Sequence, residues 1–113
     1  MNERVGAGEE YLAIQELKEK ILTAQDAIRH ASSDLNRLEN IEAKIANVIL
    51  TKYNNSSKKE VSPYSESDKR TDLKQFNKAQ HDIAQITEIM QMHQQNIIYW
   101  RKQIGEIINS IFL

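Results

Sequence analysis

Three histidines are the side chains of this chain best suited to metal binding or proton transfer. His93 interrupts a run of regularly spaced apolar residues, and a buried imidazole can act as a pH switch. His81 lies more than three helical turns from His93, so the two cannot share a site within one helix. His30 is able to approach His93 from a neighbouring helix, but it falls outside the apolar repeat. We therefore interpret His93 as a polar residue within a helix interface, and we expect no metal ion and no cofactor.

Acidic pairs, Glu9 with Glu10 and Glu16 with Glu19, are the other candidates for chemistry. Their spacing places them on the solvent side of a helix, where Glu16 can pair with Lys20. The inward Glu-x-x-His motif of di-iron bundles is missing, as are a glycine-rich phosphate loop, a nucleophile elbow and the spacing of a catalytic triad. The chain has no cysteine, which excludes disulfides and cysteine-ligated zinc. We therefore expect a protein that is not an enzyme.

Trp100 is the single tryptophan, a residue type enriched at the centres of protein interfaces. Its spacing favours a second interpretation, a core residue that fills space opposite a small side chain. Tyr99 is the better candidate for an exposed contact, and further isoleucines and a phenylalanine widen the apolar surface toward the C-terminus. The predicted partner-binding surface consists of Ile98, Tyr99, Trp100, Ile108 and Phe112.

The elements that position these residues follow from two apolar repeats with alternating steps of three and four residues. The first repeat consists of Ile14, Leu17, Ile21, Ala24, Ile28, Ala31, Leu35 and Leu38. The second consists of Phe76, Ala79, Ile83, Ile86, Met90, Ile97, Trp100, Ile104, Ile107 and Ile111, with His93 in the one polar position. Such a repeat turns one face of a helix toward a partner helix, as in a coiled coil. Beyond Asn40 the first repeat is expected to shift by one residue, onto Ile41, Ile45, Val48 and Ile49.

The sequence predicts one all-α domain, an antiparallel two-helix hairpin. Residues 1–8 are expected to form a flexible leader, because they contain two glycines, and residues 9–52 the first helix. A polar loop is predicted over residues 53–67, and the second helix over residues 68–113, with Ser67 or Asp68 as its N-cap. We expect antiparallel pairing to join residues whose numbers add up to about 120, which places Ala24 near Ile97.

A hairpin of this size has a thin core, so we expect self-association or a helical partner to complete a four-helix bundle. Fifteen basic and sixteen acidic residues are spread along the chain, and no block is basic enough to favour nucleic acid. The longest apolar run, 97–100, is far shorter than the roughly 20 residues of a membrane span. The first residues lack the apolar core of a signal peptide, which leads us to expect a cytoplasmic protein with no membrane or small-molecule partner.

The function we expect is that of a protein–protein interaction or assembly module, a subunit or adaptor of a larger complex. One alternative is a small secretion-associated helical hairpin or its chaperone. The short hairpins of bacterial type VII secretion carry Trp-x-Gly at the turn, whereas here Trp100 lies within the second helix and Lys102 replaces the glycine, so we do not assign the chain to them. A third alternative is weak nucleic-acid binding through the basic residues Lys69, Arg70, Lys74 and Lys78.

Overall fold

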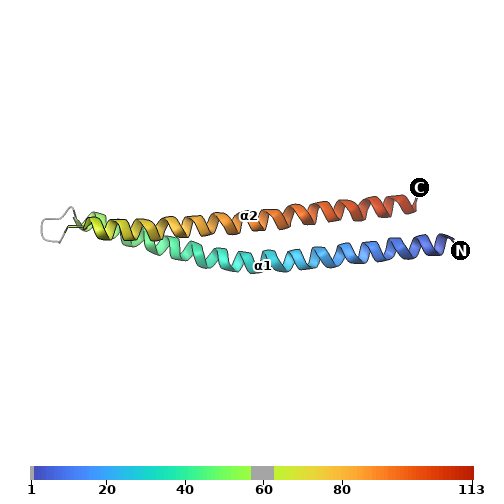
Figure 1. The fold of residues 1–113 in the computed structure, drawn as a ribbon, viewed down its shortest axis with the longest axis horizontal. Coiled ribbons are helices and arrows are strands. Elements are labelled where there is room, and N and C mark those ends of the chain that lie inside the picture. The colour runs from blue at the N-terminus through green and yellow to red at the C-terminus, as the bar shows by residue number, and fades with distance from the viewer. Residues whose placement is uncertain (1, 57–62) are drawn as a thin grey trace. The chain divides into compact units, whose positions relative to one another are not determined.

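The described part of the chain is an antiparallel hairpin of two α-helices. A computed structural model describes residues 2–56 and 63–113, with side chains described from residue 8 onward in the first range. The helices are α1 (Asn2–Ser56) and α2 (Glu66–Ile111), shown in Figure 1. These described residues contain no strand. The all-α hairpin predicted from the two apolar repeats is confirmed.

The hairpin consists of two compact units, and each unit contains a segment of both helices. The terminal unit combines Met1–Ser32 with Ile89–Leu113, and the loop unit contains Ser33–Glu88. Within each unit a segment of α1 lies beside an antiparallel segment of α2. Each unit therefore has its own interface between two helices.

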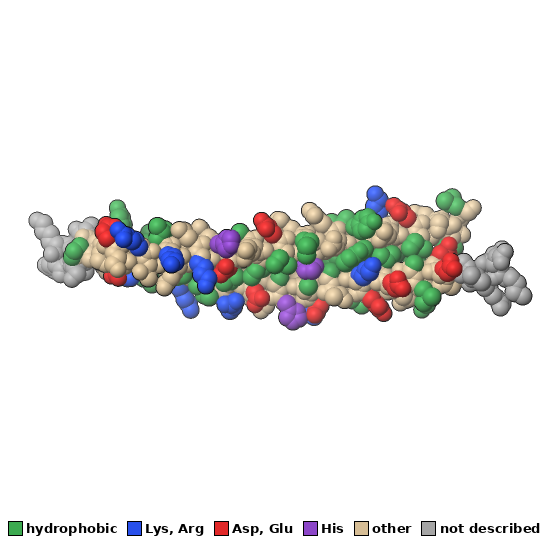
Figure 2. Space-filling model, in the orientation of Figure 1, with side chains coloured by type: hydrophobic (Ala, Val, Ile, Leu, Met, Phe, Trp, Pro, Cys, Tyr) green, Lys and Arg blue, Asp and Glu red, His purple; other side chains and the backbone are tan. Residues whose placement is uncertain are grey.

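One apolar stripe on each helix forms the interior of the units. Leu17, Ile21 and Ala24 are buried in the terminal unit, and Leu38 and Ala79 are buried in the loop unit. Nearly all other members of the two predicted repeats are half-buried. In the terminal unit, Figure 2 shows hydrophobic side chains gathered where the helices meet. Among the described residues, no large side chain is fully enclosed, so the core is narrow.

The helices pair about one helical turn away from the predicted register. The predicted rule places Lys52 opposite Asp68, but the ammonium of Lys52 lies 2.9 Å from a carboxylate oxygen of Asp72. In the terminal unit, Ala24 lines a groove together with Trp100 rather than Ile97. The residue numbers of both pairs add up to 124, four more than the predicted value.

The predicted shift of the apolar stripe near Asn40 is wrong. Ile41 and Val48 are exposed, whereas Ile45 and Ile49 continue the stripe as half-buried residues. In this repeat Glu42 lies between Leu38 and Ile45, and Lys52 follows Ile49. Both polar residues are also half-buried. The steps of three and four residues therefore continue to the end of α1. Long side chains such as lysine can cover apolar surface with their methylene stems while the charged group reaches the edge.

Both helices begin or end outside the predicted bounds. Residues 2–8 of the expected leader (residues 1–8) belong to α1, because a glycine costs a helix only about 1 kcal/mol and does not by itself end it. Residues 53–56 of the predicted loop are also helical, and the hydroxyl of Ser56 donates to the carbonyl of Tyr53 at 2.7 Å. Residues 57–62 of that loop lie outside the described residues.

Ser65, rather than Ser67 or Asp68, is the N-cap of α2. Its hydroxyl oxygen accepts a hydrogen bond from the backbone N–H of Asp68 at 3.1 Å, and its carbonyl accepts one from Lys69 N–H at 2.9 Å. Glu66 and Asp68 lie in the first turn, where the helix dipole stabilises negative charge. The helix therefore starts two residues earlier than predicted.

We predict that Leu17→Ala lowers the free energy of unfolding by about 2–4 kcal/mol, because it leaves a cavity between the helices. Leu17 is 9% exposed, whereas Leu22, on the same segment of α1, is 64% exposed. Leu22→Ala is the matched control and is expected to change stability by less than about 0.5 kcal/mol. Urea denaturation followed by circular dichroism measures both, and equal losses for the two variants would contradict the packing described here.

Candidate functional site

The predicted partner-binding residues lie in the terminal unit, and most of them are exposed. Ile98 is 68% and Phe112 is 83% exposed, and Tyr99 and Ile108 are also open to solvent. The hydroxyl of Tyr99 accepts a hydrogen bond from the amide nitrogen of Gln103 at 3.1 Å. These four side chains of α2 present apolar surface that the hairpin itself does not cover.

Trp100 differs from the other predicted partner-binding residues because it is half-buried. It lines an open groove of the terminal unit together with Ala24 and Ala27 of α1 and His93 of α2. The small alanine side chains leave room for the indole, which is the volume relation expected for a core tryptophan. Trp100 is therefore partly covered by the helix pair, and part of its side chain lines the groove.

A segment of α2 without formal charge contains Ile98, Tyr99 and Trp100. The twelve residues Ile89–Trp100 include no Asp, Glu, Lys or Arg. Seven of these residues are exposed, and each is apolar, an amide or a tyrosine: Ile89, Gln91, Met92, Gln94, Gln95, Ile98 and Tyr99. Depletion of charge together with methionine and tyrosine is typical of the core of a protein interface. The exposure of these side chains is known only from the structure.

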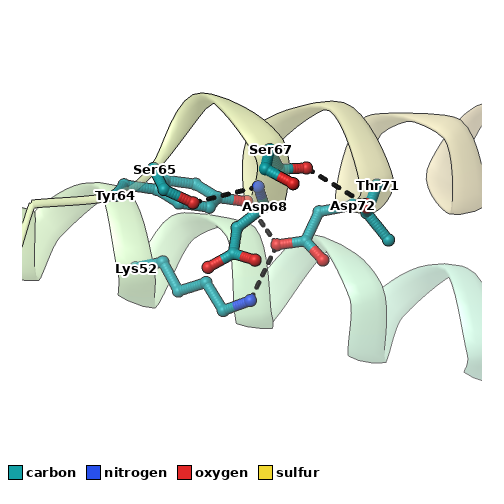
Figure 3. Close-up of polar contacts among 7 residues, drawn as sticks. All are labelled: Lys52, Tyr64, Ser65, Ser67, Asp68, Thr71 and Asp72. Carbon is teal, nitrogen blue, oxygen red and sulfur yellow. Dashed lines mark hydrogen bonds and ion pairs between the residues drawn. The ribbon is translucent and has the colours of Figure 1, made fainter.

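A polar cluster in the loop unit was missed by sequence reasoning. Asp72 accepts hydrogen bonds at one carboxylate oxygen from Lys52 of α1, at 2.9 Å, and from the hydroxyl of Tyr64 (Figure 3). The side chain of Asp72 is only 13% exposed. Lys52 and Asp72 occupy positions that continue the two apolar repeats, one on each helix. The place of each residue in the apolar repeat of its helix is the one sequence feature from which this ion pair could have been predicted.

Aromatic contacts add to this cluster just before α2 begins. The ammonium groups of Lys52 and Lys69 lie 5.5 and 5.8 Å from the centre of the Tyr64 ring. Cations at this distance are attracted to the ring face by about 0.5–1 kcal/mol at exposed sites. Because Tyr64 precedes the N-cap Ser65, its contact with Lys52 joins the start of α2 to the end of α1, whereas Lys69 belongs to α2 itself.

The cluster shifts the pKa values of its three members. Hydrogen bonds from Tyr64 and then from Lys52 hold the pKa of Asp72 below its ordinary value. The hydrogen bond to Asp72 raises the pKa of Lys52. Desolvation, followed by the hydrogen bond to Asp72, raises the pKa of Tyr64 to about 12. Each shift favours the state in which Asp72 is charged and both partners keep their protons, as expected for a structural contact.

The other candidates for chemistry do not assemble into a site. His30 is exposed, and its Nδ1 lies 2.8 Å from the carbonyl oxygen of Asp26 on its own helix. His81 is exposed in the loop unit, and Glu16 and Glu19 lie at the groove that contains Trp100. Within residues 8–56 and 63–113, no three histidine or acidic side chains come close enough to hold a metal ion.

The basic residues at the start of α2 are accompanied by acidic neighbours. Lys69 lies 3.4 Å from a carboxylate oxygen of Glu66, and Lys78 shares a groove with Asp82. This mixture of charges differs from the uniformly basic surface that binds phosphates.

Comparison of the chain with protein-family models, curated proteins and solved structures gave no match. Along the described residues, neither helix contains a stretch both long enough and apolar enough to cross a bilayer.

We predict that Tyr64→Phe removes part of the loss of stability at high pH. Because folding raises the pKa of Tyr64 from 10.0 to about 12, its contribution is present below pH 10 and is lost as the pH rises toward 12. Melting temperatures from pH 9 to 12 should therefore fall less steeply in this variant. Tyr53→Phe, at an exposed position, is the control. The difference between the tyrosine absorbance titrations of the wild type and of Tyr64→Phe reports the ionisation of Tyr64. If this difference appears near pH 10, the assignment is wrong.

We predict the opposite pH dependence for Asp72. Because its pKa is lowered by folding, its contribution is present above the ordinary value of 3.8 and is lost as the pH falls through the folded value. Asp72→Asn should therefore be less stable than wild type at pH 7, and this difference should shrink at pH 3. Thermal melts at the two pH values test this, with Asp34→Asn, at an exposed position, as the control. A difference that is the same at both pH values would contradict it.

Proposed function

We propose that the protein is a non-enzymatic protein–protein interaction module, a helical hairpin that serves as a subunit or adaptor of a larger complex. One observation carries this proposal: the C-terminal part of α2 exposes Ile98, Tyr99, Ile108 and Phe112 outside the stripe that contacts α1. Clustered apolar side chains on a surface mark sites where a partner binds.

Energetics support the same interpretation. Burial of a large apolar side chain contributes about 1.5–3 kcal/mol, and the hairpin leaves this contribution unused at Ile98, Ile108 and Phe112. The narrow interior of the two units provides few such contributions of its own. Association with another helical element would therefore stabilise both the complex and the hairpin.

The spacing of the exposed residues suits a helical partner. Ile98, Gly105 and Phe112 follow one another at intervals of seven residues, with Ile108 between the last two. Side chains at this spacing share one side of a helix, which a second helix can follow in the manner of a coiled coil or a four-helix bundle. Gly105 adds no side chain to this surface, so the backbone of a partner can approach closely there. A cytoplasmic location belongs to this proposal, and fractionation of cells that produce the protein tests it.

We predict that Ile108→Asp and Phe112→Asp, made singly, abolish assembly, because each places an uncompensated charge in the buried contact. Sedimentation velocity should show loss of oligomer, or a pull-down with the tagged full chain should show loss of its partner, while circular dichroism remains helical. Asn109→Asp introduces the same charge on the same turn at an exposed position and should retain assembly. A wild-type chain that is monomeric and retains no partner would count against the proposed function.

A further inference from the structure

Two grooves between the helices of the terminal unit lie on one side of the helix pair. The first is the groove that contains Trp100, and the second is lined by Gln103 and Glu106 of α2 among others. Glu16 and Lys20 of α1 line both grooves, so the grooves adjoin each other. We call this side of the terminal unit the grooved side.

The position of a residue relative to the apolar stripe decides on which side it lies. Lys20 and Gln103 come directly before a stripe residue, and both line the second groove. Lys18 and Arg101 come directly after a stripe residue and line neither groove. One residue turns an α-helix by about 100°, so residues before and after the stripe lie at its two opposite edges. Lys18 and Arg101 therefore lie on the side opposite the grooves, which we call the basic side.

The basic side exposes apolar side chains from both helices. Its successive members are separated by three, four or seven residues, which keeps them on one side of a helix. These exposed residues are Tyr11, Lys18 and Leu22 of α1 and Ile98, Arg101, Ile108 and Phe112 of α2. Tyr99 does not belong to them, because its hydroxyl bonds to Gln103 on the grooved side. The apolar surface of α2 is thus extended by two residues of α1.

The charges on the basic side are positive. Besides Lys18 and Arg101 it carries Arg29, seven residues after Leu22, which forms an ion pair with Asp26 of its own helix. Among the described residues, Lys18 and Arg101 are exposed and take part in no ion pair. Two cations beside an apolar surface are therefore available to a partner.

The other charged side chains described in the terminal unit lie elsewhere. Four of them line the grooves: Glu16, Glu19, Lys20 and Glu106. Glu9 lies seven residues before Glu16 and so on the same side, and Glu10, seven residues before Leu17, continues the stripe and is half-buried. Lys102 is exposed next to Arg101 and adds positive charge. The grooved side is thus mainly acidic, and the opposite side is basic.

We propose that the basic side binds an amphipathic helix of another protein, one that carries acidic residues beside its apolar stripe. The inference rests on the proposed function and deepens it by naming the chemistry of the partner. The apolar stripe of that helix covers the exposed apolar residues of both α1 and α2, and its carboxylates pair with Lys18 and Arg101. Opposite charges across an interface favour the correct partner over others.

A second copy of the chain fits this side less well. In a twofold interface both copies use the same patch, so Lys18 and Arg101 would meet a side that offers them no unpaired carboxylate. A copy that offered its acidic grooved side would leave the same surfaces free on the next molecule, and such contacts form open chains. The few basic residues also fall short of the clusters of about four to eight that bind anionic lipids.

Two synthetic helices, each roughly three heptads long, test the charge preference. Both carry leucine along one stripe, and they differ only in having glutamate or lysine beside it. Fluorescence anisotropy at low salt should show that the full chain binds the glutamate peptide roughly tenfold more tightly than the lysine peptide, and salt should reduce this difference. Equal affinities, a preference for the lysine peptide, or no binding of the glutamate peptide would overturn the proposal.

Charge-reversal variants test which side the peptide binds. Lys18→Glu and Arg101→Glu, made singly, should each weaken binding of the glutamate peptide by roughly fivefold, and the double variant should prefer the lysine peptide. Lys20→Glu is the matched control, because Lys20 is also exposed on α1 but lies on the grooved side. It should bind the glutamate peptide as the wild type does, and circular dichroism should show that all variants stay helical. If Lys20→Glu and Lys18→Glu weaken binding equally, the proposal is wrong.

Two leucines of nearly equal exposure test the contribution of α1. Leu22, on the basic side, is 64% exposed, and Leu12 is 62% exposed. Leu12 directly follows Tyr11, and a turn of about 100° directs its side chain away from the basic side. Leu22→Ala should weaken binding of the glutamate peptide by roughly tenfold, because it removes apolar area from the contact, whereas Leu12→Ala should not. Equal affinities of the two variants would show that α1 does not contribute as proposed.

The two proposals can fail separately. If the glutamate peptide does not bind while Ile108→Asp and Phe112→Asp still abolish assembly, the proposed function stands and an acidic helix is not the partner. Cosedimentation with vesicles of anionic lipid, or dissociation of a wild-type oligomer by the double charge reversal, would then identify a lipid surface or a second copy instead. If the wild-type chain is monomeric and captures neither the peptide nor another protein, both proposals are wrong.

Discussion

In each unit, α1 packs against α2 along one narrow apolar stripe, and this packing holds the two helices together. Two helices can bury only the side chains that lie between them, and here that interior contains Leu17, Ile21 and Ala24 in the terminal unit and Leu38 and Ala79 in the loop unit. Volume is matched across the helices in both units. Ala24 shares a groove with Trp100, whereas in the loop unit the alanine is on α2 and shares a groove with Leu38.

Polar residues within this stripe give the pairing its specificity. An apolar repeat is similar at every step of three or four residues, so a slip of one turn costs little apolar contact. The ion pair of Lys52 with Asp72, reinforced by Tyr64, exists in one register only. A polar residue at a core position is a well-attested way to select one alignment of two helices. The cluster in the loop unit is therefore interpreted as structural.

What the stripe leaves uncovered is the basis for the functional proposals. The terminal unit exposes apolar residues on α2 that have no role in contact with α1, and the same helix carries a segment without charge. Most solvated helix surfaces carry charges at short intervals, because charge keeps helices apart and in solution. These exposed apolar residues of the terminal unit are the observation from which a protein partner is proposed.

The helical class, the two helices and most of the buried positions could be predicted from the amino-acid sequence. These features depend on short-range periodicity, which any residue and its neighbours three or four places away express locally. It also identified Ile98, Tyr99, Ile108 and Phe112 as lying outside the stripe. The register of the helices, the half-buried position of Trp100 and the continuation of the stripe through Glu42 and Lys52 could not be predicted and became known from the folded structure. Those depend on pairs of residues far apart in the chain, such as Lys52 with Asp72, whose contact exists only after the two helices have packed.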